Sequence, residues 1–300
     1  MRILLVGQSG QVAHELERTL ACLGEVTSRS RGTQPQLDLL NPESIGPAVR
    51  EARPDLIVNA AAYTQVDRAE TDVEAAYTIN THAVEALAFA CREQNIPLIH
   101  YSTDYVFDGK AQTPYRESDP TGPDGVYASS KLQGEEAIRN AGIAHLIFRT
   151  AWVYGLHGQN FLKTMLRLMA ERESLGIVND QFGAPTWSRL IAEATALVIA
   201  QSMRNGSMDL GERSGTYHLT CAGTTTWFGF AEKIRAWGIE SGHLSASAAS
   251  LRAITTEDYP TPARRPAYSV LDNQRLMAAF GLKLPAWEEG LALCLEAKTS

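Results

Sequence analysis

The first half of the chain alternates short apolar runs with longer stretches in which apolar residues recur every three or four positions. A nearly continuous apolar run is typical of a strand buried on both faces, and the longer spacing is typical of an amphipathic helix. The apolar runs cover residues 2–7, 25–30, 55–62, 97–104 and 145–152. Strands that alternate with helices predict an α/β fold with a parallel sheet covered by helices.

The second half of the chain has a different pattern. After about residue 151 it contains helical stretches, short apolar runs and loops rich in Pro and Gly, such as residues 179–188 and 258–268. We predict two domains, with the parallel sheet in residues 1–150. Residues 151–300 are expected to form mainly a smaller α+β domain over the carboxyl edge of the sheet, and the return of some segments to the first domain is left open.

Local signals add two expectations. Asn41 is expected to cap a helix that has Pro42 at its first position. Trp227 and Phe230 lie at helical spacing in an apolar stretch, so we expect both in a core rather than in a binding pocket.

A glycine-containing turn follows the first apolar run and opens the first helical stretch. In VGQSGQVAHEL, Gly7, Gly10 and Ala13 form a GxxGxxA pattern. Gly7 allows a tight turn, Gly10 lets the backbone approach a pyrophosphate at the helix N-terminus, and Ala13 lets the helix pack closely on the strand. This context predicts a Rossmann-type, doubly wound sheet that binds a dinucleotide, and the spacing resembles the short-chain dehydrogenase/reductase superfamily.

The end of the second apolar run indicates which nicotinamide cofactor is used. An NAD site usually has an acidic residue there for the ribose 2′-hydroxyl, whereas this chain has TSRSRG. Arg29 and Arg31 could hold a 2′-phosphate through charge-assisted hydrogen bonds. We therefore predict NADPH as the cofactor, with NADH not excluded.

A tyrosine and a lysine stand four positions apart in VYASSKLQGEE, which places Tyr127 and Lys131 on one face of a helix. Ser102 and Thr103 end the fourth apolar run, at the sheet edge where ligands bind. Hydride transfer to a ketone leaves negative charge on oxygen, which a phenol can protonate if a nearby ammonium lowers its pKa. We predict Thr103, Tyr127 and Lys131 as the catalytic set of a reductase.

Composition and charge exclude several classes of protein. A net charge of −7 argues against a binder of nucleic acid or of anionic membranes, and no window approaches the roughly 18 apolar residues of a membrane span. The start, MRILLVGQSG, enters a strand directly, so we expect no signal peptide. The cysteines are far apart and are expected as reduced thiols, which favours the cytoplasm.

The chain resembles the extended short-chain dehydrogenase/reductases over nearly its whole length, and within them the dTDP-4-dehydrorhamnose reductases. The resemblance rests on segments that include GQSGQVAHEL, VNAAAYTQVDRAE, HYSTDYVFDG, VYASSKLQGE, LIFRTAWVYG, VNDQFGAPT and YPTPARRPAYSVLD. It implies reduction of dTDP-4-dehydro-6-deoxy-L-mannose (dTDP-4-dehydro-β-L-rhamnose) to dTDP-L-rhamnose with NADPH. That product is a precursor of surface polysaccharides such as the O-antigen of lipopolysaccharide.

The resemblance also implies roles for particular residues. The catalytic set again consists of Thr103, Tyr127 and Lys131. The implied cofactor contacts, besides Gly7, Arg29, Tyr127 and Lys131, are Gly10, Gln11, Val12, Arg31, Asp38, Leu39, Ala61, Ala62 and Tyr63. The implied substrate contacts are Ser102, Thr103, Asp104, Tyr105 and Trp152. Ala13 and Ala128 stand where the family usually has glycine, and both are small enough to preserve the chemistry.

Two further groups bear on the substrate and on metals. Arg264 and Arg265 could form a fork for the diphosphate of a nucleotide sugar. Related nucleotide-sugar dehydratases have Asp-Glu after the catalytic Thr, whereas Asp104 is followed here by Tyr105, which favours net reduction. Some relatives are magnesium-dependent dimers, and Glu15 stands where an acidic ligand would lie. It has no convincing companion, so we expect no metal site and leave Mg²⁺ dependence and a homodimer open.

Three alternatives to this function were weighed. The chain could reduce a different deoxysugar nucleotide, or it could be an epimerase, which needs only transient oxidation. It could also be a non-catalytic regulatory homologue, like the regulatory subunit of methionine adenosyltransferase, which resembles the same family. The intact Thr103, Tyr127 and Lys131 set favours an enzyme.

Overall fold

The parallel sheet predicted from the apolar runs is present, and it gains a strand from the second half of the chain. The computed structural model describes residues 1–33, 36–204 and 206–299. Within these ranges a six-stranded, all-parallel sheet has the order β12-β5-β4-β3-β1-β2. Its strands are β1 (Arg2–Val6), β2 (Glu25–Arg29), β3 (Leu56–Asn59), β4 (Leu98–Thr103), β5 (His145–Thr150) and β12 (Gly215–His218).

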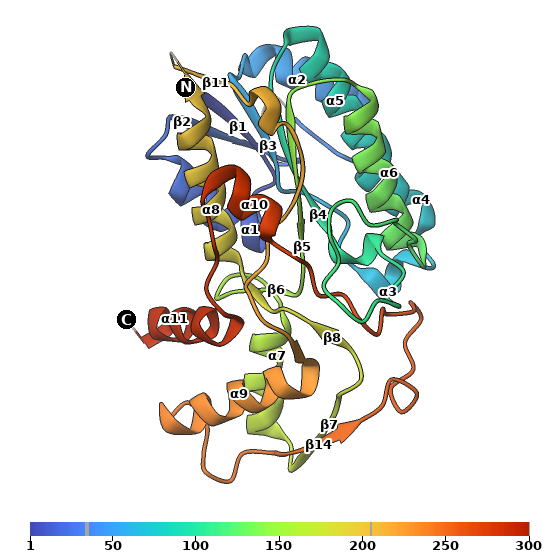
Figure 1. Cartoon of the computed structure of the whole chain (residues 1–300), viewed down its shortest axis with the longest axis vertical. Helices are drawn as coiled ribbons and strands as arrows, with labels where there is room; N and C mark the ends of the chain where they lie inside the picture. Colours follow the sequence, from blue (N-terminus) through green and yellow to red (C-terminus); the bar gives the residue numbers. More distant parts are fainter. Residues whose placement is uncertain (34–35, 205, 300) are drawn as a thin grey trace.

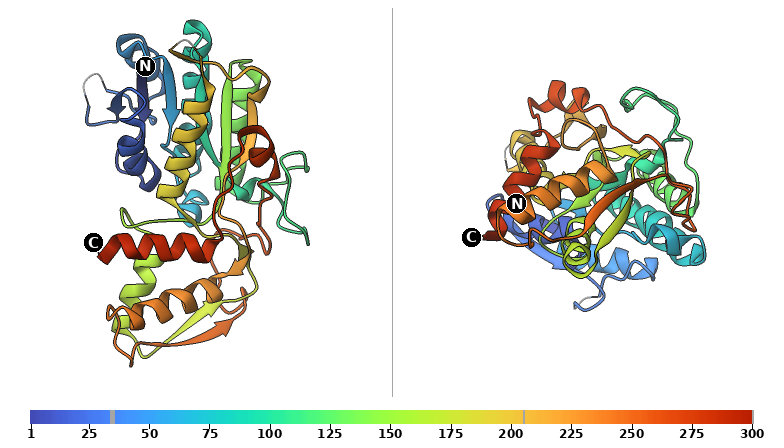
Figure 2. Two further views of the ribbon diagram at one scale, coloured as in Figure 1. Left: turned by 60° about the vertical axis from the view of Figure 1, so that its left-hand side comes forward. Right: turned by 90° about the horizontal axis from the view of Figure 1, so that it is seen from below.

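Helices cover both faces of the sheet. Successive side chains of a buried strand point to opposite sides, so both faces are apolar and each needs a covering layer. In β1, Ile3 and Leu5 belong to one apolar core, and Leu4 and Val6 belong to the other. The first face is covered by α1 (Gln11–Leu20), α8 (Ser188–Ser202) and α10 (Gln274–Phe280), and the second by α2 (Ile45–Ala52), α5 (Ala83–Gln94) and α6 (Val126–Asn140) (Figures 1 and 2). The Rossmann-type, doubly wound α/β fold is confirmed.

A smaller α+β part lies below the carboxyl ends of these strands (Figure 1). Its main elements are α7 (Phe161–Glu171), β7 (Ser174–Val178), α9 (Trp227–Glu240), β14 (Ser250–Ile254) and α11 (Trp287–Thr299). Strands β7 and β14 pair in parallel although more than 70 residues separate them. This part has its own apolar core, in which Phe230 is fully buried, as expected from its spacing.

The remaining elements of the two parts are short. They are η1 (Pro42–Ser44), α3 (Val66–Ala69), α4 (Val73–Tyr77), η2 (Thr78–His82), η3 (Asp104–Val106), β6 (Val153–Tyr154), β8 (Phe182–Gly183), β9 (Thr186–Trp187), β10 (Met203–Arg204), β11 (Ser207–Met208), η4 (Gly211–Arg213) and β13 (Thr225–Thr226). The helix expected after Asn41 begins as the 3₁₀ turn η1 and continues as α2. The Asn41 side chain makes no capping hydrogen bond there.

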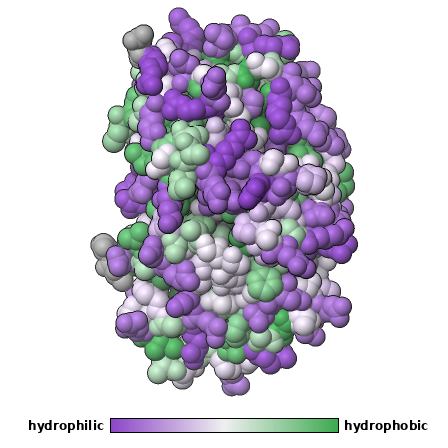
Figure 3. Space-filling model, in the orientation of Figure 1, coloured by the Kyte–Doolittle hydropathy of each residue, from purple (hydrophilic) through white to green (hydrophobic). Residues whose placement is uncertain are grey.

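The surface is mainly hydrophilic on the face shown in Figure 3, and hydrophobic side chains are scattered on it. The most exposed large apolar side chains, such as Tyr259, Leu197 and Phe89, come from separate elements. Among the described residues, no helix combines the length and apolar character that crossing a membrane requires.

Candidate active site

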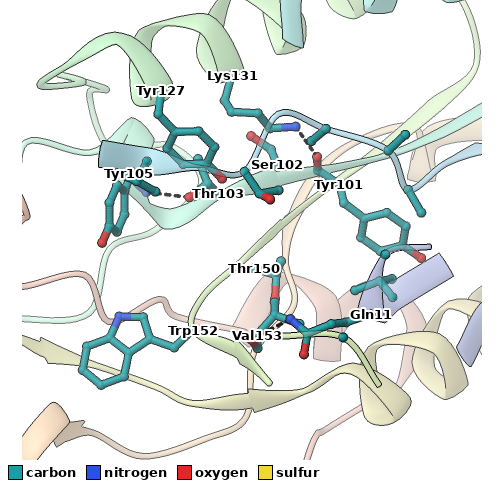
Figure 4. A pocket seen from close by; sticks show the side chains of 18 of the residues that line it. Gln11, Tyr101, Ser102, Thr103, Tyr105, Tyr127, Lys131, Thr150, Trp152 and Val153 are labelled. Carbon is teal, nitrogen blue, oxygen red and sulfur yellow. Dashed lines mark hydrogen bonds between the residues drawn. The ribbon is translucent and has the colours of Figure 1, made fainter. Parts of the chain in front are cut away.

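A cavity of about 690 Å³ lies where the carboxyl ends of β1, β3, β4 and β5 face the smaller part of the molecule (Figure 4). The strand order reverses between β1 and β3, and ligands bind at such reversals in open parallel sheets. Its lining includes Gly7, Gly10, Gln11, Val12, Ala61, Ala62, Ser102, Thr103, Asp104, Tyr105, Tyr127, Lys131, Trp152 and Arg265, which the sequence predicted, and Gln8, Ser9, Thr64, Thr150, Gly158, Gln159 and Trp227, which it did not.

The glycine turn closes one end of the cavity. Gly7 has a φ of +107°, and a Cβ there would lie 3.2 Å from the backbone nitrogen of Ala61. A side chain there would be strained by the backbone conformation and crowded by Ala61. Gly10 immediately precedes α1, so the free N–H groups of the first helical turn point toward the cavity end. This arrangement fits an anionic group such as a pyrophosphate.

A smaller cavity of about 220 Å³ continues from the glycine turn to the end of β2. Its lining includes Arg29, Arg31, Asp38, Leu39 and the shared residues Ala61 and Ala62. Tyr63 lies apart from the linings of both cavities: its hydroxyl donates to Asp72 and its backbone N–H donates to Asn80. The two basic side chains at the end of β2 and the glycine turn together form a site that fits a dinucleotide with an added phosphate.

Tyr127, Lys131 and Thr103 meet at the centre of the larger cavity. Tyr127 and Lys131 project from α6, and the Tyr127 hydroxyl points toward Thr103 at the end of β4 (Figure 4). The Thr103 hydroxyl donates to the Asp104 carboxylate at 3.1 Å and accepts from the backbone N–H of Tyr105 at 3.2 Å. Lys131 Nζ donates to the backbone oxygen of Tyr101 at 2.7 Å, so it is fixed beneath the cavity floor.

Burial controls the protonation of these groups. It raises the pKa of Tyr127 to about 12, and hydrogen bonding between the Tyr127 and Thr103 hydroxyls only partly opposes this. Burial also lowers the pKa of Lys131 to about 8, while the charge of Glu135 opposes the shift. The expectation that Lys131 makes Tyr127 more acidic stays a prediction, and burial acts in the opposite direction because it disfavours the phenolate.

Further polar groups line the cavity beside Tyr127. Burial raises the pKa of Asp104 to about 6, although hydrogen bonds from Ser269 and Thr103 oppose the shift. The Thr150 hydroxyl at the end of β5 is buried and has no hydrogen-bond partner. A buried orphan hydroxyl at a cavity wall is available to a polar ligand, and only its position at the end of a strand could have indicated it from the sequence.

Two tryptophans form the wall opposite Tyr127. The rings of Trp152 and Trp227 stack with centroids 3.6 Å apart. The prediction that Trp227 belongs to a core is wrong, because its indole lines this cavity and a neighbouring one. The error arises because Trp227 begins α9 at the edge of the smaller part, where its indole stacks on Trp152 and also contacts Phe161.

The neighbouring cavity has a volume of about 600 Å³ and lies within the smaller part. Apolar side chains such as Met165, Leu168 and Ile177 line it, and Arg265 borders both cavities. Arg265 donates to the Asp67 carboxylate at 2.7 Å, whereas Arg264 is 81% exposed and pairs with Asp124. The structure therefore separates the two arginines that the sequence grouped together.

No cluster of three or more His, Cys, Asp or Glu side chains suited to a metal occurs in residues 1–33, 36–204 and 206–299. Glu15 is buried on α1.

Comparison with known proteins identifies relatives across the full length. Residues 1–300 match the family model described as RmlD substrate binding domain. The chain is 48% identical to the dTDP-4-dehydrorhamnose reductase of Burkholderia thailandensis, over 98% of both proteins. Among solved structures, it superimposes on the dTDP-4-dehydrorhamnose reductase of Clostridium acetobutylicum with a TM-score of 0.89 and 34% identity, covering 100% of both chains. The corresponding Bacillus anthracis reductase, solved in complex with NADP, gives a TM-score of 0.85 and 32% identity, covering 99% of both chains.

Proposed function

The chain belongs to the RmlD substrate binding domain family, and on that premise we propose that it is an NADPH-dependent dTDP-4-dehydrorhamnose reductase. Its reaction would be the reduction of dTDP-4-dehydro-6-deoxy-L-mannose to dTDP-L-rhamnose. The observation that carries this proposal is a single cavity that contains the glycine turn, the Thr103, Tyr127 and Lys131 set, and Trp152.

Several residues of this chain would hold the cofactor. The N-terminus of α1 and Gly10 fit its pyrophosphate, and Arg29 with Arg31 fit a 2′-phosphate. The NADP in the Bacillus anthracis relative supports the choice. When bound, NADPH supplies the hydride for the C4 ketone of the sugar.

Tyr127 would supply the proton. Its hydroxyl lies beside that of Thr103, so a ketone oxygen next to both could accept a hydrogen bond from each once the Thr103 hydroxyl turns away from Asp104. A phenol with a raised pKa holds its proton at neutral pH and releases it when negative charge develops on the oxygen. Lys131 beneath the floor would bind the nicotinamide ribose and stabilise the phenolate that forms.

The substrate would span both cavities. Trp152, Asp104, Tyr105 and Ser102 would contact the sugar in the larger cavity, and Arg265 would hold the diphosphate at the boundary. The nucleoside would then enter the apolar cavity of the smaller part. Residues 1–150 would thus mainly bind the cofactor, and residues 151–300 would mainly bind the substrate, with α8, β12 and α10 returning to the sheet.

The cellular setting belongs to the same proposal. Cys22, Cys91, Cys221 and Cys294 form no disulfide with one another, which supports a reducing, cytoplasmic location. The product would serve the assembly of a surface polysaccharide. We propose no nucleic-acid or membrane partner, and a homodimer and Mg²⁺ dependence are open to measurement.

One assay tests the function. The protein is mixed with NADPH and dTDP-4-dehydro-6-deoxy-L-mannose, NADPH oxidation is followed at 340 nm, and the product is identified by NMR. Stoichiometric oxidation with formation of dTDP-L-rhamnose is expected. A different 6-deoxyhexose, or C3 or C5 inversion without oxidation, would replace this function by another reductase or an epimerase. Cofactor binding with no conversion of any such sugar would indicate a regulatory protein.

A further inference from the structure

A fully buried histidine connects the cofactor side of the cavity to Lys131. His100 lies on β4, between Asn59 of β3 and Lys131 of α6, and these side chains are 0–2% exposed. Asn59 Nδ2 lies 3.0 Å from His100 Nδ1, and Lys131 Nζ lies 3.2 Å from His100 Nε2. The three side chains form one continuous line of hydrogen-bonding groups beneath the cavity.

The direction of this line is fixed at its Asn59 end. The backbone N–H of Ala61 can only donate, and it donates to Asn59 Oδ1 at 3.2 Å. The other amide atom, Nδ2, can also only donate, so His100 Nδ1 must accept. A neutral imidazole that accepts at Nδ1 has its proton on Nε2. The backbone therefore sets the tautomer of His100.

The other end of the line meets Lys131. The Nε2–H group of His100 points at Nζ, and only a neutral amine has the lone pair that accepts this hydrogen bond. An ammonium has three N–H groups and no acceptor, so it would face His100 donor to donor. Lys131 already directs one N–H to the Tyr101 oxygen. The line thus stabilises the neutral form of Lys131 relative to the charged form.

The charge nearest to Lys131 favours its ammonium form, but that charge is itself largely neutralised. Glu135, one turn further along α6, favours the ammonium of Lys131. Its carboxylate is itself bound by Arg149 at 2.7 Å and Arg139 at 3.0 Å. On the cavity side, the titratable or charged side chains are Tyr127 on the same helix, Tyr101, Asp104 and Tyr105 on or after β4, and Arg265. Burial and the charge of Lys131 both lower the pKa of His100, so its imidazole stays neutral.

We propose that His100 is a positioning residue of the reductase, whose Nε2–H group, fixed by Asn59, sets the pH at which Lys131 loses its proton. In the proposed function, on which this inference rests, the ammonium form of Lys131 stabilises the Tyr127 phenolate. His100 then defines the alkaline limit of the reduction without touching the substrate or the cofactor.

The tautomer is measured in the protein alone. The chain has seven histidines, and long-range ¹⁵N–¹H NMR spectra report which ring nitrogen of each carries the proton. The His100 signals are assigned by their loss in His100→Gln. A neutral ring protonated at Nε2 is expected. A proton on Nδ1, or a charged ring, at pH 7 would overturn the proposal. Apart from the signal assignment, this measurement uses only the wild-type protein.

Asn59→Asp tests the consequence for Lys131. An aspartate accepts from both the Ala61 N–H and a His100 Nδ1–H, so the tautomer reverses and Nε2 can accept from the ammonium. The Lys131 titration, followed through its ¹³Cε signal, should move upward by about one pH unit or more. His100→Gln should keep the wild-type midpoint, because its amide can still accept from Asn59 and donate to Lys131. His218→Gln, at another fully buried histidine that contacts the Asp272 backbone, is the control.

Activity provides a second measurement, and this one depends on the proposed function, unlike the titration of Lys131. The alkaline limb of kcat should move with the Lys131 midpoint in Asn59→Asp and stay in place in the two Gln variants. If the tautomer reverses while the Lys131 midpoint stays fixed, His100 does not control Lys131. If the midpoint moves in a protein that reduces no sugar, the inference about Lys131 holds and the proposed function fails.

Discussion

The indole of Trp152 lies flat on that of Trp227, with planes 6° from parallel. Trp152 adopts a left-handed backbone conformation with a φ of +46°, which costs free energy in a bulky residue. Its ring edge lies over Gly183 of β8, where an added Cβ would collide with the indole. The stack and the absence of a side chain at Gly183 together hold Trp152 against the cavity.

Gly183→Ala is therefore expected to displace the Trp152 indole. The KM for the sugar nucleotide should rise and kcat/KM should fall by about tenfold or more, because small displacements of positioning groups reduce rates strongly. The dissociation constant of NADPH should stay the same. Gly46→Ala on α2, where the added Cβ meets only the end of the Arg50 side chain, is the control. Equal kinetics for the two variants would show that Gly183 does not position Trp152.

Tyr127→Phe removes the proposed proton donor and leaves the ring that packs at right angles against Tyr105. The value of kcat should fall by about 10²- to 10⁴-fold, which is the usual contribution of general acid catalysis. NADPH affinity, measured by fluorescence titration, should change little. Tyr217→Phe, which removes a hydroxyl bonded to the distant Arg213 oxygen, is the matched control. A Tyr127→Phe protein that keeps half of the wild-type turnover would exclude Tyr127 as the acid.

Arg265→Ala should weaken binding of dTDP by about one to two powers of ten, since a hydrogen bond to a charged group contributes roughly 1.5–3 kcal/mol. Arg265→Lys should recover part of this affinity, because the planar fork is lost. Isothermal titration calorimetry with dTDP measures both. Arg264→Ala, next in sequence but directed to solvent and Asp124, is expected to have a much smaller effect. The reverse order of effects would place the diphosphate at Arg264.

Replacing Arg29 and Arg31 together with Ala should raise the KM for NADPH and leave that for NADH nearly unchanged. Both residues line the small cavity at the end of β2, at the site expected for the 2′-phosphate. Arg18→Ala, on the exposed last turn of α1, controls for the loss of positive charge. Equal increases in the KM for NADPH and for NADH would mean that the two arginines contribute to cofactor binding without contacting the 2′-phosphate.

Asp104→Asn is expected to stabilise the protein at neutral pH. Burial raises the pKa of Asp104 in the folded protein to about 6, from an ordinary value of 3.8. Between these values the folded form holds a proton that the unfolded chain has lost, so the free energy of unfolding falls as the pH rises through this window. The variant should gain about 1–3 kcal/mol at pH 7 and less at pH 5.

Urea unfolding at both pH values measures this gain. Asp108→Asn is a control of opposite sign, because a hydrogen bond from Tyr115 lowers the pKa of Asp108. That variant should lose stability at pH 7. If Asp104→Asn also loses stability at pH 7, contacts such as that with Ser269 compensate for the buried charge, and Asp104 is ionised at little cost.

The sequence determined the elements whose signals are local. Nearly continuous apolar runs indicated β1, β3, β4 and β5, because strands buried on both faces need mostly apolar side chains, whereas the edge strand β2 was indicated by its place between two helical stretches. Gly7 was identified because glycine readily adopts the positive φ of that turn, and Gly10 was identified by its place just before the first helical stretch. The four-residue spacing put Tyr127 and Lys131 on one helical face wherever the helix packs.

Only the tertiary structure decided which distant groups meet. The pairing of β12 with β5, the stack of Trp152 on Trp227 and the separation of Arg265 from Arg264 depend on packing between segments far apart in sequence. The pKa values depend on burial, which raises that of Tyr127 in a way that its spacing from Lys131 does not show. The tautomer of His100 requires the distances to Asn59 and Lys131, because a hydrogen bond has a direction that sequence spacing does not record.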